Sequence, residues 1–298
     1  MCHRPTAAHA GVTAADTLRP RTTGEAITMT IPTTLHSAAS PDGTVIGFTS
    51  TGSGRPLVLV HGGTADRRRW TPVLPLLERG HRVHAVDRRG RGLSTDGAHY
   101  TIEREYEDVA ALVDALAREG GGGVDVLGHS YGALCVLGAL GLTSCLRRVV
   151  LYEPPLNAAG RIPAEVVSEL DSLLARGHNA EAVAYFFRTV VGMPERELDL
   201  LRALPAWRDR VAAAPTIARE LRAADAYRFD PARLRAVTCP VLLLLGGDSP
   251  APVREDARML ARALRGSRVH VLPGQRHVAM DTAPELFARA VTAFLDQR

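Results

Sequence analysis

The chain contains no lysine: all 36 of its basic residues are arginine, and the formal net charge at pH 7 is +4. An excess of positive charge can indicate nucleic-acid binding, but these arginines alternate with acids, as in Glu195-Arg196-Glu197. Mixed runs of this kind are typical of solvated helix faces. The cluster Arg67-Arg68-Arg69 could contact an anionic substrate, although a plain surface turn is the simpler interpretation. The charge pattern therefore argues against a nucleic-acid partner.

Long apolar runs are also missing, since the best one, residues 241–245, has only the length of a strand. A membrane span needs about 20 apolar residues, so none is expected. The four cysteines show neither C-x-x-C spacing nor the framework of a secreted disulfide protein, which favours a reducing cytoplasm. No metal-ligand pattern is found among the 11 histidines. We therefore expect no metal site.

What is present fits a globular protein. Apolar residues make up 46% of the chain and charged residues 23%, which excludes a disordered chain. A length of 298 residues suits one α/β domain with an insertion. Residues 1–30 differ, because they are rich in Ala, Thr and Arg, with no periodicity and no apolar signal-peptide core. We expect a disordered tail there, with Met29 as a possible alternative start of translation.

Regular patterns begin near residue 33. Two strand-like segments at 33–39 and 44–51 flank the turn Ser40-Pro41-Asp42-Gly43 and predict a β-hairpin. The continuous apolar run at 56–60 predicts a strand buried on both faces, as in a parallel sheet. Strand patterns at 82–86, 124–127, 148–152, 241–245 and 269–272 then alternate with helical patterns at 70–77, 102–118, 131–140, 253–264 and 284–295. This alternation predicts an α/β fold with helices on both faces of a parallel sheet.

Strand patterns stop between residues 154 and 234, where apolar residues recur at helical spacing. We therefore predict a core formed by residues 31–153 and 235–298 and a helical cap at 154–234. The cap contains much of the chain's small aromatic content, including Phe187, Trp207 and Tyr227. These three are candidates to line an apolar substrate pocket, although packing of the cap helices would also explain them.

The segment Gly128-His129-Ser130-Tyr131-Gly132 carries the clearest chemical signal. It matches G-x-S-x-G between a predicted buried strand and a predicted helix, which is the context that gives this motif meaning. The glycines permit a sharp turn, and the serine then lies exposed at a helix N-terminus, where the helix dipole favours negative charge. We identify Ser130 as the candidate nucleophile over an incidental serine in a glycine-flanked turn.

A serine nucleophile needs a base, and the base needs a carboxylate to orient it. His277 follows the last predicted strand, so it lies at the same sheet edge as Ser130. Asp248 follows the strand before it and gives the chain order Ser-Asp-His. We favour Asp248 as the carboxylate, although it could be an ordinary helix cap. Glu153, after the strand at 148–152, is its rival and otherwise a pocket or capping residue.

Acyl transfer also requires hydrogen-bond donors for a developing oxyanion. The backbone N–H of Tyr131 is one candidate donor. The second is expected from the loop His61-Gly62-Gly63-Thr64, most simply from Gly63, because glycine lets the backbone approach a substrate closely.

Taken together, these segments resemble the α/β-hydrolase superfamily from about residue 33 to the end of the chain. The stretch 87–94, Asp-Arg-Arg-Gly-Arg-Gly-Leu-Ser, is similar to the family's D-x-R-G-x-G-x-S loop, in which Arg89 would brace the loop. The resemblance implies an eight-stranded, mostly parallel sheet, a helical cap over the site, and no metal or organic cofactor. Ser130 disfavours the epoxide hydrolase and haloalkane dehalogenase branches, which carry an aspartate at that position.

The leading hypothesis is a serine hydrolase that cleaves an ester, thioester or lactone of a small, largely apolar molecule. A second is a non-hydrolytic enzyme of the same fold: a lyase, cyclase, acyltransferase or perhydrolase. A third is a ligand-binding module, against which a full Ser-Asp-His set argues. No membrane or nucleic-acid partner is expected under any of them.

Overall fold

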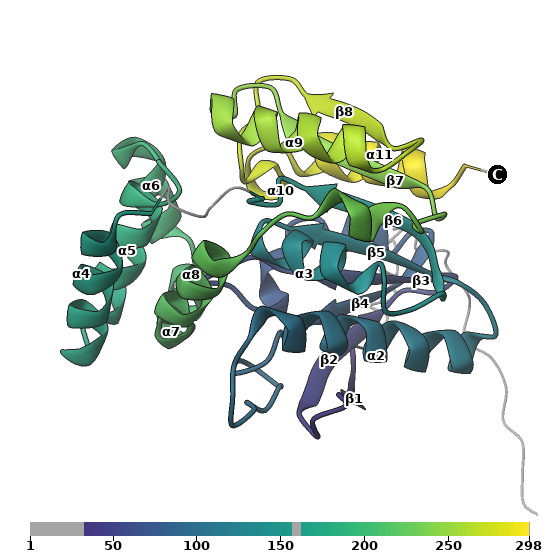
Figure 1. Ribbon diagram of the computed structural model, residues 1–298, viewed down its shortest axis with the longest axis horizontal. Helices are drawn as coiled ribbons and strands as arrows, with labels where there is room; N and C mark the ends of the chain where they lie inside the picture. The colour runs from purple at the N-terminus through teal and green to yellow at the C-terminus, as the bar shows by residue number, and fades with distance from the viewer. Residues whose placement is uncertain (1–32, 157–161, 298) are drawn as a thin grey trace, which may run out of the picture. The chain divides into compact units, whose positions relative to one another are not determined.

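The computed structural model describes residues 33–156 and 162–297 (Figure 1). The expected disordered tail at 1–30 and the alternative start at Met29 lie outside the described residues.

Within that part of the chain, eight strands form one sheet in the order β1-β2-β4-β3-β5-β6-β7-β8. The β1–β2 and β2–β4 pairs are antiparallel, and every other pair is parallel. This is the predicted α/β architecture, with the predicted hairpin at its start. The strands are β1 Thr34–Ala39, β2 Val45–Thr51, β3 Arg55–Val60, β4 His81–Val86, β5 Val124–His129, β6 Leu146–Tyr152, β7 Val241–Gly246 and β8 Arg268–Leu272.

Helices cover both faces of the sheet (Figure 1). On one face α2, α3 and α9 share a hydrophobic core with the strands, and α1 and α11 do so on the other. The helices are α1 Leu74–Leu77, α2 Ile102–Gly120, α3 Tyr131–Ala139, α9 Ala251–Ala263, α10 Ala279–Thr282 and α11 Pro284–Leu295. The helix predicted at 70–77 is instead a 3₁₀ turn, η1 Arg67–Trp70, followed by the single turn of α1. Pro72 and Pro75 lack the amide hydrogens that a continuous helix would use there.

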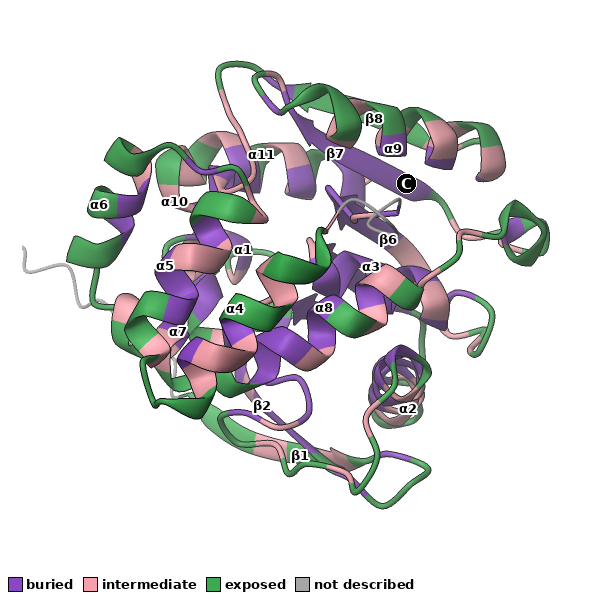
Figure 2. Cartoon of the chain, turned by 60° about the vertical axis from the view of Figure 1, so that its left-hand side comes forward, coloured by how far each residue is buried: buried purple, intermediate pink, exposed green. Residues whose placement is uncertain are grey.

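The described residues of the segment predicted as a cap contain helices and no strand. It contains α4 Ala164–Ala175, α5 Asn179–Thr189, α6 Glu195–Ala203, α7 Trp207–Ala212, α8 Ile217–Ala226 and the short 3₁₀ turns η2 Ala214–Thr216 and η3 Pro231–Leu234. Its helices have a hydrophobic cluster of their own, to which α4, α5, α6 and α8 contribute. Figure 2 shows buried residues along α5 and α8.

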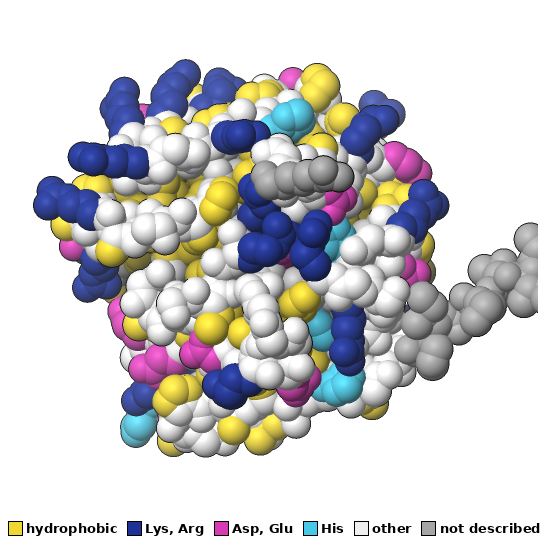
Figure 3. Space-filling view, turned by 90° about the vertical axis from the view of Figure 1, so that its right-hand side faces the viewer, with side chains coloured by type: hydrophobic (Ala, Val, Ile, Leu, Met, Phe, Trp, Pro, Cys, Tyr) yellow, Lys and Arg dark blue, Asp and Glu magenta, His cyan; other side chains and the backbone are white. Residues whose placement is uncertain are grey.

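Figure 3 shows one face of the molecule, on which arginine side chains dominate the upper half, with apolar and neutral groups between them, and acidic side chains lie mainly lower down and at the right edge. None of the helices in the described residues has both the length and the apolar character that a bilayer crossing requires.

Candidate active site

Ser130 lies in a strained turn between β5 and α3. Its backbone has φ +54° and ψ −124°, in a region that residues with a Cβ rarely adopt. Its N–H donates to the carbonyl of Tyr152 on the neighbouring strand at 2.8 Å. Glycine is required on both sides, because a Cβ on Gly128 would lie 2.6 Å from Ala133 Cα and one on Gly132 would collide with the His61 carbonyl. The G-x-S-x-G prediction of a tight strand-to-helix turn is confirmed.

His277 lies in the loop after β8 and binds a buried carboxylate. Its Nδ1–H donates to Glu153 Oε2 at 2.7 Å. The other oxygen, Oε1, accepts from the backbone N–H of Gly246 at 2.8 Å and from Ser249 Oγ at 2.6 Å. All of these contacts lie at the carboxyl ends of β6, β7 and β8. Glu153 is thus the residue that orients the imidazole, and both of its oxygens are occupied.

The environment of Glu153 favours its charged form. Burial by itself raises the carboxyl pKa, but the hydrogen bonds from His277, Ser249 and Gly246 outweigh burial and lower the pKa below its usual value. The residue also has a positive φ of 49°, so the backbone turns sharply just after β6 and directs the side chain toward the histidine loop. Glu153 therefore faces His277 as a carboxylate.

Our choice of Asp248 for this place is wrong. Asp248 is exposed, and its backbone N–H donates to the Gln275 carbonyl at 2.9 Å. In the turn after β7 it is the next residue, Ser249, that is fully buried and reaches Glu153. The turn thus directs residue 248 toward solvent, a detail that chain order alone could not reveal. The rival candidate, Glu153, occupies the position.

Two aromatic side chains fix the loop that carries His277. His129 lies beneath the His277 ring, with ring centroids 4.7 Å apart, and its Nε2–H donates to the His277 carbonyl at 2.8 Å. Burial, and secondarily the proximity of His277, lower the pKa of His129 well below its usual value, so its ring is neutral. The hydroxyl of Tyr152 donates to the Arg276 carbonyl and accepts from Ala279 N–H at 3.2 Å. The histidine is therefore held from its backbone as well as from its ring.

Gly63 and Tyr131, the two expected oxyanion donors, line the same cavity as Ser130 and His277. The Gly63 loop is anchored from behind: Arg88 N–H donates to His61 Nε2 at 3.2 Å, and its Nη2 donates to the Gly62 carbonyl at 3.1 Å. Ser130 and His277 themselves are not joined by a hydrogen bond in the described structure. Such bonds often tighten only when substrate binds.

The cavity has a volume of about 390 Å³ and a mainly aliphatic wall. Cap residues on that wall include Val166, Phe186, Val190, Ile217 and Leu221. None of the three residues predicted to line the pocket is among the described residues that line this cavity. Phe187 lines only a smaller adjoining space.

The other two predicted aromatics are used for packing. Neither Trp207 nor Tyr227 is among the described residues that line the cavity. Trp207 packs in the cap's own hydrophobic cluster, and Tyr227 packs against the core cluster to which α2 and α3 contribute. The presence of an aromatic residue in the sequence does not show whether it lines the cavity or packs between helices. The aliphatic residues that line the cavity have no sequence pattern that would identify them.

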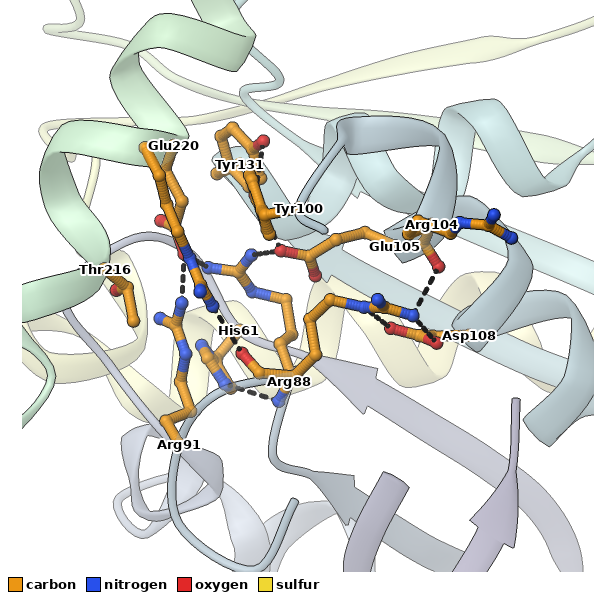
Figure 4. Close-up of polar contacts among 12 residues, drawn as sticks. His61, Arg88, Arg91, Tyr100, Arg104, Glu105, Asp108, Tyr131, Thr216 and Glu220 are labelled. Atoms are coloured by element: carbon orange, nitrogen blue, oxygen red, sulfur yellow. Dashed lines mark hydrogen bonds and ion pairs between the residues drawn. The ribbon is translucent and has the colours of Figure 1, made fainter. Parts of the chain in front are cut away.

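The cap is tied to the core by a buried ion-pair cluster (Figure 4). Glu220 of α8 accepts from Arg88 at 2.9 Å and also from Arg91. Arg88 in turn donates to Glu105 of α2 at 2.7 Å. All four charged side chains are nearly or fully buried, and their two positive and two negative charges balance. The cluster joins the cap, the loop after β4 and the loop that carries Gly63.

Arg89 braces its loop as the family resemblance implied. Its guanidinium donates to both oxygens of Asp108 at 2.7 Å and to Asp42 at 2.9 Å. The described residues contain no group of three or more His, Cys, Asp or Glu side chains placed to hold a metal ion.

Several known proteins are similar to this chain. The α/β hydrolase family model matches residues 57–290. A curated relative, 2-hydroxy-6-oxo-6-(2'-aminophenyl)hexa-2,4-dienoic acid hydrolase of Metapseudomonas resinovorans, is 26% identical over 84% of this chain and 87% of its own. The pimeloyl-[acyl-carrier protein] methyl ester esterase of Neisseria meningitidis is 27% identical over 81% of this chain and 94% of its own.

Solved structures of α/β hydrolases are also similar to this chain. An α/β hydrolase from Sphaerobacter thermophilus is 34% identical and superposes with a TM-score of 0.76, over 87% of this chain and all of the other. The esterase RhEst1 from Rhodococcus sp. ECU1013 is 27% identical, with a TM-score of 0.68 over 88% of this chain and 98% of its own. The family model alone covers well over half of the sequence. The chain therefore belongs to the α/β hydrolase family, and its relatives support a hydrolase.

Proposed function

We propose that this protein is a serine hydrolase that cleaves an ester, thioester or lactone of a small, largely apolar molecule. The observation that carries the proposal is the set Ser130, His277 and Glu153 at one sheet edge, with the His277–Glu153 hydrogen bond of 2.7 Å already formed. Ser130 attacks the substrate carbonyl, and Nε2 of His277 accepts the hydroxyl proton. Glu153 holds the histidine in the tautomer that leaves Nε2 free and stabilises the imidazolium that forms.

The negative charge that develops on the carbonyl oxygen is bound by the backbone N–H groups of Gly63 and Tyr131. Protonated His277 then donates its proton to the leaving group, and the acyl group remains on Ser130. In the second half of the reaction His277 takes a proton from water, and the resulting hydroxide attacks the acyl-enzyme. The bond to Ser130 Oγ then breaks, protonated His277 returns its proton to that oxygen, and the acyl group leaves as a carboxylic acid. The mainly aliphatic wall of the cavity supports an apolar substrate body.

The test is a set of initial rates on p-nitrophenyl esters from acetate to long chains, for the wild type, Ser130→Ala and His277→Ala. We expect turnover by the wild type and a loss of several orders of magnitude in each variant, on the order of 10³-fold or more. The chain-length optimum would measure the usable depth of the cavity. Esterase activity retained by purified, folded Ser130→Ala would disprove the assignment. No turnover by folded wild type would favour the non-hydrolytic chemistries of this fold.

A further inference from the structure

The cap helix α7 places a buried guanidinium next to the candidate nucleophile. Arg210 is only 4% exposed and lines a space of about 30 Å³ together with Gly63, Ser130 and His277. This space adjoins the main cavity, because the same three residues line both. It can hold a group of a few non-hydrogen atoms.

Arg210 has no carboxylate partner. In the described structure no acidic oxygen lies within 4.0 Å of its guanidinium, and its Nε has no hydrogen-bond acceptor. Its Nη1 lies 3.4 Å from Thr64 Oγ1 and 3.5 Å from the Thr64 carbonyl, which is long for hydrogen bonds to arginine. The acid next to it in sequence, Asp209, binds Arg68 instead at 2.8 Å.

The other cation of the same space is already neutralised. Arg69 forms an ion pair with Asp281 at 2.5 Å and also contacts the Met280 sulfur. The guanidinium carbon of Arg210 also lies 5.1 Å from the centroid of the Phe187 ring. The space beside Ser130 thus carries a guanidinium that no described acid contacts directly, while Asp281, Asp66 and Asp209 act on it from beyond ion-pair distance. Burial and, secondarily, the charge of Arg69 lower the pKa of Arg210 to about 9, so it remains protonated near neutral pH.

A buried guanidinium with no carboxylate in contact and poorly satisfied N–H groups is costly, and a bound anion would lower that cost. We propose that the substrate carries a carboxylate and that Arg210 binds it beside Ser130. This inference rests on the proposed hydrolase function and narrows it: the substrate has an apolar body, a scissile carbonyl and one anionic end. Arginine suits this role because its planar guanidinium can donate two parallel hydrogen bonds to the two oxygens of a carboxylate.

The test compares pairs of substrates that differ only in charge. Monomethyl succinate, glutarate and adipate are each paired with the methyl ester in which the free carboxylate is replaced by a neutral amide. We expect wild type to prefer the carboxylate member of at least one pair by about 10- to 100-fold in kcat/KM. Arg210→Gln should abolish this preference, and Arg210→Lys should retain part of it. Arg208→Gln, which removes an exposed arginine from the same helix, is the matched control and should behave as wild type.

Two results would overturn the proposal: wild type that does not distinguish the members of any pair, or an Arg210→Gln protein with a normal melting transition that still prefers the carboxylate. The wild-type result does not depend on whether a variant folds. Calorimetric titration of succinate, glutarate and adipate into Ser130→Ala measures binding without turnover. If Ser130→Ala binds a dicarboxylate, Ser130→Ala/Arg210→Gln does not, and wild type hydrolyses no ester, then the anion site is supported and the hydrolase function is refuted. If wild type hydrolyses esters but Ser130→Ala binds none of the dicarboxylates, the hydrolase function is supported and the anion site is refuted.

Discussion

Exchange of Glu153 for glutamine tests which carboxylate serves His277. The glutamine side chain would fit the same buried space, but only one of its two terminal atoms accepts hydrogen bonds. The Gly246 N–H and the Ser249 hydroxyl both require an acceptor in place of Oε1, so the amide nitrogen would have to face His277. A donor at that place forces Nδ1 to become the acceptor and moves the imidazole proton to Nε2. His277 could then no longer accept the proton of Ser130.

We expect Glu153→Gln to lower kcat by about 10⁴-fold, the order of loss seen when a triad histidine is held in the wrong tautomer, or about 5.5 kcal/mol in activation free energy. KM should change little, because both oxygens of Glu153 are already bound to His277, Gly246 and Ser249, and its side chain is not available to substrate. The matched variant is Asp248→Asn, which alters an exposed side chain and should stay within about twofold of wild type.

Initial rates on p-nitrophenyl butyrate measure both variants, with thermal melts to verify that each is folded. The opposite pattern would refute the reasoning: a loss of about 10³-fold or more in Asp248→Asn together with near-normal turnover by Glu153→Gln would place the functional carboxylate after β7.

Three further changes test the scaffold around the site. Glu220→Gln removes the negative charge that Arg88 and Arg91 share, and denaturant unfolding should show that the free energy of unfolding falls by about 3 kcal/mol. Burial lowers the pKa of His84 to about 4, so the unfolded chain takes up a proton there at higher pH than the folded one. Stability should therefore fall as the pH drops from 6.5 toward 4, by about 1.4 kcal/mol per pH unit from this residue, and His84→Gln should remove that contribution. Gly128→Ala should cost about 1–3 kcal/mol, because its Cβ would meet backbone 2.6 Å away.

Each of these changes has a comparison that could contradict it. A loss well below about 1 kcal/mol in Glu220→Gln would mean that the ion pairs do not hold the cap. His270 is exposed, so His270→Gln should keep the wild-type slope of stability against pH, and an equal change of slope in both histidine variants would rule out His84 as the source. A Cβ on Gly122 would meet nothing within 4 Å, and Gly122→Ala should be as stable as wild type. Equal losses in the two glycine variants would disprove the steric explanation.

The sequence predicts the fold well because the strands are short and bounded by turn residues, and those in the middle of the sheet, such as β3 and β7, are mostly apolar. The runs at 56–60 and 241–245 are buried on both faces, and continuous apolar character is what that position requires. Ser130 is identifiable for a local reason: the two glycines, the serine and the change from strand to helix all lie within a few residues of one another in the sequence. The single turn of α10 had no such local pattern and was missed.

The carboxylate and the pocket wall depend on contacts between distant segments. Asp248 and Glu153 both follow strands at the carboxyl-end edge of the sheet, where Ser130 and His277 lie. The turn after β7 places Asp248 in solvent, whereas Glu153 faces the histidine. A signal did exist in the pair Pro154-Pro155, which ends β6 abruptly and keeps Glu153 at the sheet edge. Arg210 could not be found from sequence at all, because nothing in its flanking residues distinguishes it from the exposed arginines of the cap.

Ser130 and Glu153 follow adjacent parallel strands, with His129 opposite Tyr152 and the Ser130 N–H bonded to the Tyr152 carbonyl. The distance between the backbones of Ser130 and Glu153 is therefore set by the spacing of neighbouring strands in the sheet, about 4.8 Å. Neither the length of the cap nor the connection between β7 and β8 enters into it. For protein engineering, this means that a graft within the cap that keeps Glu220 and Pro154-Pro155 can alter what enters the cavity while the serine and the glutamate stay in register.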